Sequence, residues 1–501
     1  MTAQALQPAP HAHAPAPAVA GDPPAAIVAG GGIAGIAAAI RLADAGLRVT
    51  LLETRPRLGG RATSFEDPRS SEVLDNCQHV VMGCCTAYLH LLDRLGVRDQ
   101  IEWTRDQLWL ERGSGRASTV RPSAIPAPFH FAPAVARAKF LSAREKAALA
   151  WGAHVVAHAK REAWRDRTFA QFLAHARQPD SLVRKFWEPV VVSACNLPCD
   201  RACAASALMV FQDGFFGSPR AADIGVSRVP LLRLYDRAAA ALAGTGGVVR
   251  LGFSVERVGP AHVEGVCKGR RERLDAPAVV CALPIERALG VIDPAILSAD
   301  GRFPPMLTPG DAPAGDRSRW AFSPILGVHL AFDRPVLRAP HAVLVPDASA
   351  APAPAVQWLF RKDGEGRRVH AVISAADAWV PMPEAEIVER VRADIEAHIP
   401  EARGARVEWA RAVKEKRATF APTPEVERLR PPATGSSGLI LAGDYTATGW
   451  PATMEGAARS GFTAAAAVLD RLGRSADAAA ASAPAMLPRA GLARWLVARG
   501  A

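Results

Sequence analysis

The first folded segment has a pattern of apolar runs and glycines that predicts a strand, a tight turn, a helix and a second strand. The apolar run 26–29 stops at three consecutive glycines, and 33–45 follows without a helix-breaking residue. Gly46 stands where a left-handed residue caps a helix, and 48–52 then supplies an aliphatic, β-branched run. We therefore predict a βαβ unit near the start of the chain.

Later segments change between helical and strand periodicity. From about residue 105 to 223 the pattern is Ala-rich and helical, with Pro-punctuated loops, which predicts an inserted helical cap. Strands are predicted at 248–251, 254–258, 278–282, 327–332, 371–374 and 439–442, and a helix from about Met454 to Leu472.

The composition predicts a folded protein of several domains. The 501 residues are 49% hydrophobic and 22% charged, which is ordinary for a globular chain. The formal net charge of +11 comes from Arg residues spread along the chain, so we do not expect nucleic-acid binding. Eight cysteines are too few for a secreted disulfide framework, and we find neither a signal peptide nor a spanning helix. We therefore expect a cytoplasmic location.

The glycines Gly30, Gly32 and Gly35 fit the pattern G-x-G-x-x-G. This pattern serves a tight turn, close approach of backbone to a pyrophosphate, and close packing of helix on strand. Glu53 lies 21 positions after Gly32, at the end of the second strand. A carboxylate there accepts hydrogen bonds from a ribose diol and repels a 2′-phosphate, so FAD or NAD is favoured over NADP.

The segment after the second strand offers further groups for a phosphate. Gly59 and Gly60 let backbone approach a cofactor closely, and Arg55 and Arg61 can neutralise a phosphate or hold the neighbouring loop. From the residues alone, an ordinary turn explains the segment equally well.

Glu53 followed by Gly59-Gly60-Arg61 resembles the superfamily of FAD-dependent amine oxidases and carotenoid desaturases. A second match runs from Gly443-Asp444 to Met454 and beyond, and is similar to the carboxy-terminal flavin motif of that superfamily. The resemblance implies that FAD is the cofactor.

The same resemblance assigns roles to three distant positions. It implies that Gly443 and Asp444 hold the ribityl and pyrophosphate region of FAD, and that backbone at Val255 contacts adenine. The helix that begins at Met454 would bring a second helix N-terminus to the flavin.

The predicted fold class is α/β, with a Rossmann-like FAD-binding domain built from discontinuous segments and a mixed-sheet and helical substrate domain. We assign 22–105, 224–285 and 435–472 to the FAD-binding domain, and 106–223 and 286–434 to the substrate or cap domain. Residues 1–21 are predicted to be a disordered leader, and 473–501 a tail.

The segment 75–80, Asp-Asn-Cys-Gln-His-Val, is similar to a motif of the hydroxysqualene dehydroxylases of hopanoid biosynthesis. The chain departs from that motif at Cys77, where the family usually has Gly. Glycine adopts positive φ readily, but Cys does so only at a cost. The match therefore does not determine the backbone conformation of this loop.

This second resemblance implies reductive removal of the hydroxyl of hydroxysqualene, with reduced flavin delivering a hydride to the allylic carbon. His79 is our candidate for the acid that helps hydroxide leave, and bracing of the flavin is the alternative. Gln78 is expected to position flavin or substrate. The implied substrate is a long apolar isoprenoid, and the sequence does not indicate the electron donor.

Three other functions fit parts of the sequence. A carotenoid or phytoene desaturase would use oxidised flavin on a similarly apolar polyene. A flavin amine oxidase is less favoured, because the three tyrosines offer no evident aromatic pair around an amine. A non-catalytic isoprenoid carrier of the same fold is disfavoured by the intact motifs around Glu53 and Asp444.

Two remaining features each allow two interpretations. Cys195, Cys199 and Cys203 recur at helical spacing, but Pro198 interrupts the helix and no fourth ligand is evident, so we predict buried structural cysteines and no metal site. Residues 486–499 combine apolar anchors with arginines, which suits either an interfacial membrane contact or a solvated tail.

Overall fold

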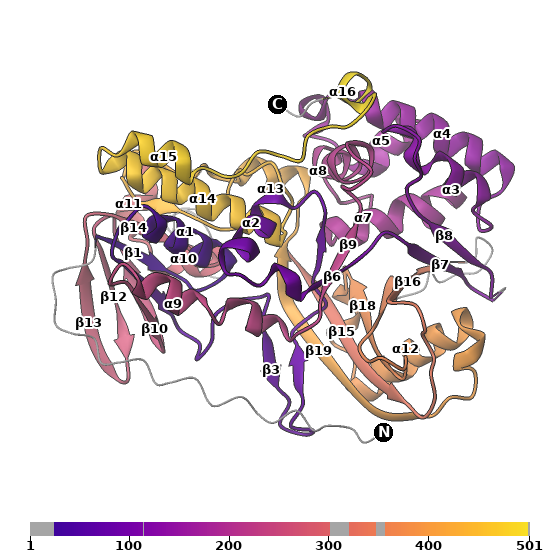
Figure 1. The fold of residues 1–501 in the computed structure, drawn as a ribbon, viewed down its shortest axis with the longest axis horizontal. Coiled ribbons are helices and arrows are strands. Elements are labelled where there is room, and N and C mark those ends of the chain that lie inside the picture. Colours follow the sequence, from indigo (N-terminus) through magenta and orange to yellow (C-terminus); the bar gives the residue numbers. More distant parts are fainter. Residues whose placement is uncertain (1–24, 114, 301–319, 347–355, 499–501) are drawn as a thin grey trace.

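The computed structural model describes residues 25–113, 115–300, 320–346 and 356–498. The predicted leader, 1–21, lies outside the described residues. The chain forms two halves that lie side by side, a nucleotide half around a parallel sheet and a substrate half around a longer mixed sheet (Figure 1).

A five-stranded parallel sheet, in the order β10-β2-β1-β14-β20, is the centre of the nucleotide half. Strands distant in sequence lie next to one another, so the prediction of a Rossmann-like domain built from discontinuous segments is confirmed. The strands are β1 (Ala26–Ala29), β2 (Val49–Glu53), β10 (Val248–Leu251), β14 (Val279–Cys281) and β20 (Ile440–Leu441).

The two faces of this sheet are covered by different layers, which is why its central strand, β1, is apolar throughout. Ala26 and Val28 pack against helices, while Ile27 and Ala29 pack toward a three-stranded antiparallel sheet. The covering elements are α1 (Ile33–Asp44), α2 (Thr86–Arg94), α9 (Ala238–Ala243) and α14 (Met454–Arg471), and, on the other side, β11 (Phe253–Val258), β12 (His262–Cys267) and β13 (Arg270–Asp275).

Two small sheets hold the segment 75–80 between the halves. Asp75 ends β4 and Val80 begins β5, so the residues between them form a short loop with both ends fixed. The pairs are β3 (Ser64–Glu66) with β4 (Val73–Asp75), and β5 (Val80–Met82) with β9 (Ile224–Ser227), which also pairs with β6 (Ile101–Thr104).

A seven-stranded mixed sheet, in the order β19-β15-β18-β17-β16-β7-β8, forms the substrate half. Residues alternate between its faces: Val369 and Ala371 pack against α12 (Glu384–His398), whereas Val372 faces the opposite side. The strands are β7 (Gln107–Glu111), β8 (Ala117–Val120), β15 (Phe322–Phe332), β16 (His341–Val345), β17 (Trp358–Arg361), β18 (Arg368–Ser374) and β19 (Val407–Phe420).

The prediction that 105–223 is helical is wrong at its start. Residues 107–111 form β7, which pairs in parallel with β16 more than 200 positions later. On its other edge β7 pairs antiparallel with residues 117–120, so the segment begins with a hairpin joined to a distant strand. The rest of the segment is largely helical, with α3 (Ala132–Arg137), α4 (Ala143–His158), α5 (Phe169–His175), α6 (Asp180–Leu182), α7 (Glu188–Cys195), α8 (Ala204–Met209) and a π-helical segment η5 (Val210–Phe216).

Two helices inside the predicted substrate segment 286–434 pack on the nucleotide side. Residues of α10 (Ile285–Val291) and α13 (Pro424–Leu429) share a buried cluster with β11, β14 and Tyr445. The helix α11 (Pro294–Asp300) follows α10. The nucleotide half therefore takes more of the chain than the predicted boundaries give it.

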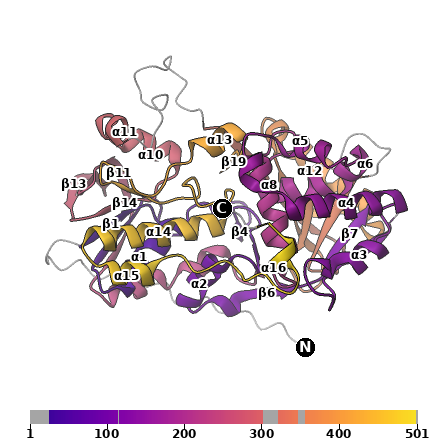
Figure 2. The same ribbon diagram turned by 90° about the horizontal axis from the view of Figure 1, so that it is seen from above.

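The described part of the tail, 473–498, is folded against the body, unlike a solvated tail. It contains α15 (Ser475–Ala481) and a last helical turn, α16 (Ala493–Leu496). Both views show it running from the nucleotide half across to the cap helices (Figures 1 and 2). Among the described residues, no helix is long and apolar enough to span a membrane.

Candidate active site

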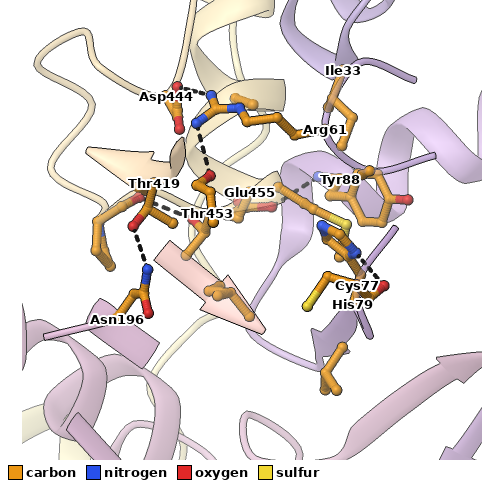
Figure 3. A pocket seen from close by; sticks show the side chains of 18 of the residues that line it. Ile33, Arg61, Cys77, His79, Tyr88, Asn196, Thr419, Asp444, Thr453 and Glu455 are labelled. Atoms are coloured by element: carbon orange, nitrogen blue, oxygen red, sulfur yellow. Dashed lines mark hydrogen bonds and ion pairs between the residues drawn. The ribbon is translucent and has the colours of Figure 1, made fainter. Parts of the chain in front are cut away.

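One cavity of about 650 Å³ reaches from the glycine turn of the nucleotide half to the long sheet of the substrate half (Figure 3). Its walls include Gly30, Glu53, His79, Asp444 and Trp358, which come from regions far apart in the chain. Because both predicted cofactor motifs line this cavity, we consider it the candidate active site.

The glycine turn between β1 and α1 contains two kinds of glycine. Gly30 has a φ of +117°, and a Cβ on Gly35 would lie 1.8 Å from the carbonyl oxygen of Gly30. A Cβ on Gly32 would meet nothing nearer than Gly60, at 3.9 Å. Packing of the protein itself therefore requires Gly30 and Gly35, whereas Gly32 leaves room for a ligand at the N-terminus of α1.

Glu53 is held at the cavity wall by two backbone groups. Its Oε2 accepts a hydrogen bond from the N–H of Gly31 at 2.9 Å, and its Oε1 accepts one from the N–H of Arg55 at 2.8 Å. Each carboxylate oxygen keeps a lone pair for a further donor. The position suits a ribose diol, and that role stays a prediction.

The segment 55–61 folds onto the glycine turn. The N–H of Gly59 donates to the carbonyl oxygen of Gly31 at 2.9 Å, and both Gly59 and Gly60 have positive φ, at +104° and +61°. Arg55 is exposed and donates to the carbonyl oxygen of Gly60 at 3.2 Å. All three predicted residues line the cavity, and a Cβ on Gly60 would lie 3.0 Å from Cα of Gly32.

An ion pair joins the first predicted motif to the last. Nη2 of Arg61 lies 2.6 Å from Oδ1 of Asp444, and Nη1 of Arg61 donates to the carbonyl oxygen of Ala418 on β19 (Figure 3). Burial disfavours the charge of Arg61, but attraction to Asp444 outweighs it and raises the pKa of Arg61. Residues 383 positions apart thus meet at one wall of the cavity.

The carboxy-terminal motif presents a second helix N-terminus. Gly443 has a φ of +152°, and its N–H donates to the hydroxyl of Ser460 at 2.8 Å. The helix α14 begins at Met454, where the hydroxyl of Thr453 caps it by accepting from the N–H of Gly456 at 3.1 Å. Gly443, Thr453 and Met454 all line the cavity.

Val255 lies at the nucleotide end of the cavity. It is buried on β11, and the pairing of β11 with β12 shifts register between Val255 and Arg257. Such a bulge breaks the regular ladder beside Val255. Contact of its backbone with adenine stays a prediction.

The loop 75–79 accommodates Cys77 without left-handed backbone. Among the described residues, the non-glycine positions with positive φ are Ser71, Arg177, Asn196, Lys268 and Ala375. The conformational cost considered for Cys77 therefore does not arise. The side chain is buried, and burial raises the pKa of its thiol to about 12, so Cys77 remains protonated.

His79 faces the cavity with one ring nitrogen already engaged. Nδ1 lies 3.0 Å from the carbonyl oxygen of Cys77, which can only accept, so Nδ1 carries a hydrogen (Figure 3). In the neutral ring Nε2 is then unprotonated. Burial lowers the pKa of His79, although the Cys77 carbonyl and Asp75 oppose that change.

Gln78 is held by a lysine that the sequence did not reveal. Nζ of Lys362 donates to Oε1 of Gln78 at 3.2 Å and pairs with Oδ2 of Asp75 at 3.1 Å. The amide of Gln78 donates to the carbonyl oxygen of His79 at 3.2 Å. Lys362 follows β17, so it reaches this loop only through the tertiary fold.

The substrate end of the cavity is almost free of charge. Of the described residues that the cap and the seven-stranded sheet contribute to its wall, only Glu415 is ionisable. Oε2 of Glu415 accepts a hydrogen bond from Asn76 at 2.9 Å. The other contributors include Trp109, Val190, Phe215, Val343, Trp358, Phe360 and Val372.

Three further residues that sequence analysis missed shape the walls. Asn196 donates to Thr419 at 2.9 Å and accepts from the N–H of Ala375 at 2.7 Å, which ties the cap to the long sheet (Figure 3). Nε1 of Trp358 donates to Ser193 at 2.6 Å. The one available signal was Asn196 directly after a helix, a position where Asn tolerates left-handed backbone.

Arg430 supports the flavin motif from behind. Its buried guanidinium donates to the carbonyl oxygens of Asp444 and Thr446 at 3.0 and 2.7 Å, and it pairs with Glu427 at 2.9 Å. It therefore fixes the backbone that carries Asp444. No local pattern around Arg430 indicated this role.

The three spaced cysteines do not form a stripe on one helix. Cys195 ends α7, where Asn196 is left-handed, and Cys199 and Cys203 lie beyond it. All three are buried, and burial raises each thiol pKa, to about 11 for Cys203. No group of three or more potential metal ligands occurs within the described part of the chain.

The residues around the nucleotide end fit FAD. Two helix N-termini, those of α1 and α14, meet the cavity, as does the carboxylate of Glu53, and the wall beside Gly32 is open where a Cβ would intrude on a ligand. His79 lines the same cavity, as do the mostly apolar residues of the cap and the long sheet.

Comparison with known proteins finds a matching flavoenzyme family and several similar enzymes. The family described as flavin containing amine oxidoreductase matches residues 33–469. The chain is 28% identical to hydroxysqualene dehydroxylase of Sinorhizobium fredii, over 87% of this chain and 95% of that protein. The protein of the same name from Zymomonas mobilis is 27% identical, over 87% and 96%. Zeta-carotene desaturase of Capsicum annuum is 24% identical, over 88% and 80%.

Solved structures share the fold. A variant of putrescine oxidase superposes with a TM-score of 0.65 at 19% identity, covering 89% of this chain and 99% of that one. Cyclohexylamine oxidase of Brevibacterium oxydans gives a TM-score of 0.62 at 17% identity, covering 90% and 100%. At these identities the likeness concerns the fold alone.

Proposed function

The chain belongs to the flavin-containing amine oxidoreductase family, and from that premise we propose that it reduces hydroxysqualene to squalene. The family and its relatives make the protein an FAD-dependent oxidoreductase, and the predicted cofactor is confirmed. The proposal for the substrate is supported by the relatives named hydroxysqualene dehydroxylase and by the apolar end of the cavity.

The proposal rests mainly on the difference in charged residues between the two ends of the cavity. Its nucleotide end contains Glu53, Arg61 and Asp444, whereas the wall contributed by the cap and the long sheet has Glu415 as its one ionisable residue in the described chain. A long polyene without charge fits such a wall, because few charged groups would lose water when the polyene displaces it.

The reaction balances as a hydride transfer with loss of water. The bound flavin, once reduced, supplies the hydride to the allylic carbon. The carbon–oxygen bond of the substrate breaks, and the departing hydroxide takes a proton from the protein. A two-electron donor, which the sequence does not identify, must restore the reduced cofactor.

We assign the proton to Nε2 of His79. Because Nδ1 donates to the carbonyl oxygen of Cys77, Nε2 can donate only when the ring is doubly protonated. Burial lowers the pKa of His79, so its imidazolium is a stronger acid than an exposed one and is populated at lower pH. Gln78, fixed by Lys362, would position flavin or substrate beside it.

The substrate also bears on location. Hydroxysqualene is nearly insoluble in water and resides in bilayers, so we propose that the protein works in the cytoplasm and touches the inner face of the membrane.

A desaturase is the second candidate, since the chain is also similar to zeta-carotene desaturase. That reaction would run in the opposite direction, with the cofactor taking a hydride from a polyene. For an amine oxidase, the tyrosines do not form an aromatic cage around the substrate end. Of the three tyrosines only Tyr88 lines the cavity, and its hydroxyl lies 3.1 Å from that of Tyr235.

Incubation of the FAD-loaded protein with dithionite and detergent-dispersed hydroxysqualene tests the proposal. We expect squalene, identified by mass spectrometry, and no product when dithionite or protein is omitted. Reduced, flavin-loaded protein that yields no squalene would refute the assignment. Formation of a more unsaturated product from phytoene by the oxidised protein would favour the desaturase instead.

A further inference from the structure

Two segments near the carboxy-terminus and in the cap expose large apolar side chains. Ile125 and Phe129, in the loop before α3, are 42% and 50% exposed, and Leu492 and Trp495, at α16, are 48% and 80% exposed. These four are among nine large hydrophobic residues exposed in the described chain, and they lie on only two short stretches. Clustering of this kind marks an interaction surface.

The two segments form one surface. The N–H of Ala493 donates to the carbonyl oxygen of Ala127 at 2.8 Å, and a Cβ on Gly491 would lie 3.0 Å from Pro126. Small residues face inward: Ala127, Ala493 and Val497 share a buried cluster. Folding therefore uses the small side chains and leaves the large ones pointing out.

The charges of both segments have a single sign. Residues 112–144 contain six Lys or Arg and no Asp or Glu, and 478–501 contain three Arg and no Asp or Glu. The whole chain is far closer to balance, with 60 basic and 49 acidic residues. Arg137, Lys139 and Arg494 are exposed in these segments. Apolar tips among cations suit a surface of anionic phosphates over hydrocarbon.

This surface lies next to the cavity. Phe216 of η5 packs against the buried cluster beneath the surface, and the ring of Phe131 lies 6.2 Å from that of Phe215. Phe215 and Gly214, on the same segment, line the cavity. The short segment η5 thus contacts both the outer surface and the substrate end.

We propose that this docking surface, 125–129 with 491–495, lies on an anionic phospholipid bilayer and that the apolar substrate passes from the bilayer to the cavity beside η5. The identity of the substrate rests on the proposed function, but binding to lipid does not. We expect a protein partner to present charges of both signs, whereas the headgroups of an anionic bilayer present negative charge only, which matches the positive charges of these segments.

Sedimentation of the FAD-loaded protein with vesicles tests the docking surface. We expect binding to vesicles of phosphatidylcholine mixed with phosphatidylglycerol and weaker binding to phosphatidylcholine alone. Trp495→Ser should weaken binding on the order of tenfold, and Arg494→Glu roughly as much on the anionic vesicles only. Trp103→Ser, at another exposed tryptophan of the nucleotide half, should bind as the wild type does.

Absence of vesicle binding, or equal binding by Trp495→Ser and the wild type, would overturn the proposal and leave a protein partner for this surface. Turnover separates this failure from failure of the proposed function. With hydroxysqualene in vesicles, Trp495→Ser should lose rate in proportion to its lost binding, whereas with hydroxysqualene in detergent it should match the wild type. A wild type inactive in detergent refutes the proposed function alone, because the sedimentation result is independent of turnover.

Discussion

The nucleotide half and the substrate half of the cavity are built from opposite kinds of residue. The first uses glycines, helix N-termini and the partly buried pair of Arg61 with Asp444, while the second uses apolar side chains of long strands. An anionic dinucleotide needs donors and close backbone at fixed points, whereas an apolar polyene needs volume without charge. The halves should therefore respond differently to substitution.

The largest effect should come where the halves meet, at His79. His79→Gln should lower kcat by about a hundredfold or more, because a general acid is lost, while flavin content stays unchanged. Since burial holds the pKa of His79 below its ordinary value of 6.5, wild-type turnover should rise as pH falls toward that lowered pKa and decline as pH rises above it. The variant should lack this dependence.

The surroundings of His79 set the direction of that profile. Asp75 and Glu415 favour the charged ring, whereas Arg61 disfavours it. His90→Gln, at a partly buried histidine on α2, is the matched control and should keep both rate and profile. If His79→Gln retains the wild-type pH profile, His79 only braces the site.

Breaking the pair in the nucleotide half should affect cofactor affinity next most. Asp444→Ala leaves Arg61 without its carboxylate partner. Because Arg61 is one-third exposed, solvent limits the cost, and we expect the free energy of FAD binding to weaken by about 2 kcal/mol, or roughly thirtyfold in affinity. Fluorescence titration of the apoprotein with FAD measures it. Asp93→Ala removes an equally short but exposed pair with Arg98 and should leave FAD affinity unchanged. Equal affinities of the two variants would contradict the role of Asp444.

A glycine substitution can separate cofactor binding from folding. Gly32→Ala places a methyl group in open space at an ordinary φ of −76°, so apoprotein stability should be unchanged while FAD binding weakens by about tenfold. Thermal denaturation and FAD titration follow the two effects. Gly290→Ala, also in open space but away from the cavity, should change neither property appreciably. Undiminished FAD binding by Gly32→Ala would place the pyrophosphate elsewhere.

The smallest effect should come from a polar atom at the substrate end. Val372→Thr places a hydroxyl in the cavity wall and should raise KM for hydroxysqualene by about threefold, with unchanged flavin content. Val369→Thr makes the same change on the other face of β18, against α12, and should lower the Tm without changing KM. Identical KM values for both variants would mean that Val372 does not contact substrate.

Sequence analysis predicted the nucleotide half much better than the substrate half. The features around Gly30, Glu53 and Gly443 are local, because tight turns, strand ends and helix caps require particular residue types at adjacent positions. The strands predicted at 248–251 and 278–282 also followed from short apolar runs, and both lie in the sheet of the nucleotide half.

Features that depend on pairing between distant segments left no local mark. Residues 107–111 join the seven-stranded sheet through β16, and Lys362, which follows β17, reaches Gln78 only through the tertiary fold. Asn196 likewise bonds to Thr419, 223 positions away. Such contacts require the tertiary fold before they can be anticipated.

The most direct test of the account follows the flavin itself in a single turnover. Protein-bound FAD is photoreduced without oxygen and mixed with detergent-dispersed hydroxysqualene while the absorbance of oxidised flavin is recorded. We expect the yellow absorbance to return as one equivalent of squalene forms. Flavin that stays reduced with hydroxysqualene, in a protein whose oxidised form is bleached by phytoene, would contradict the account.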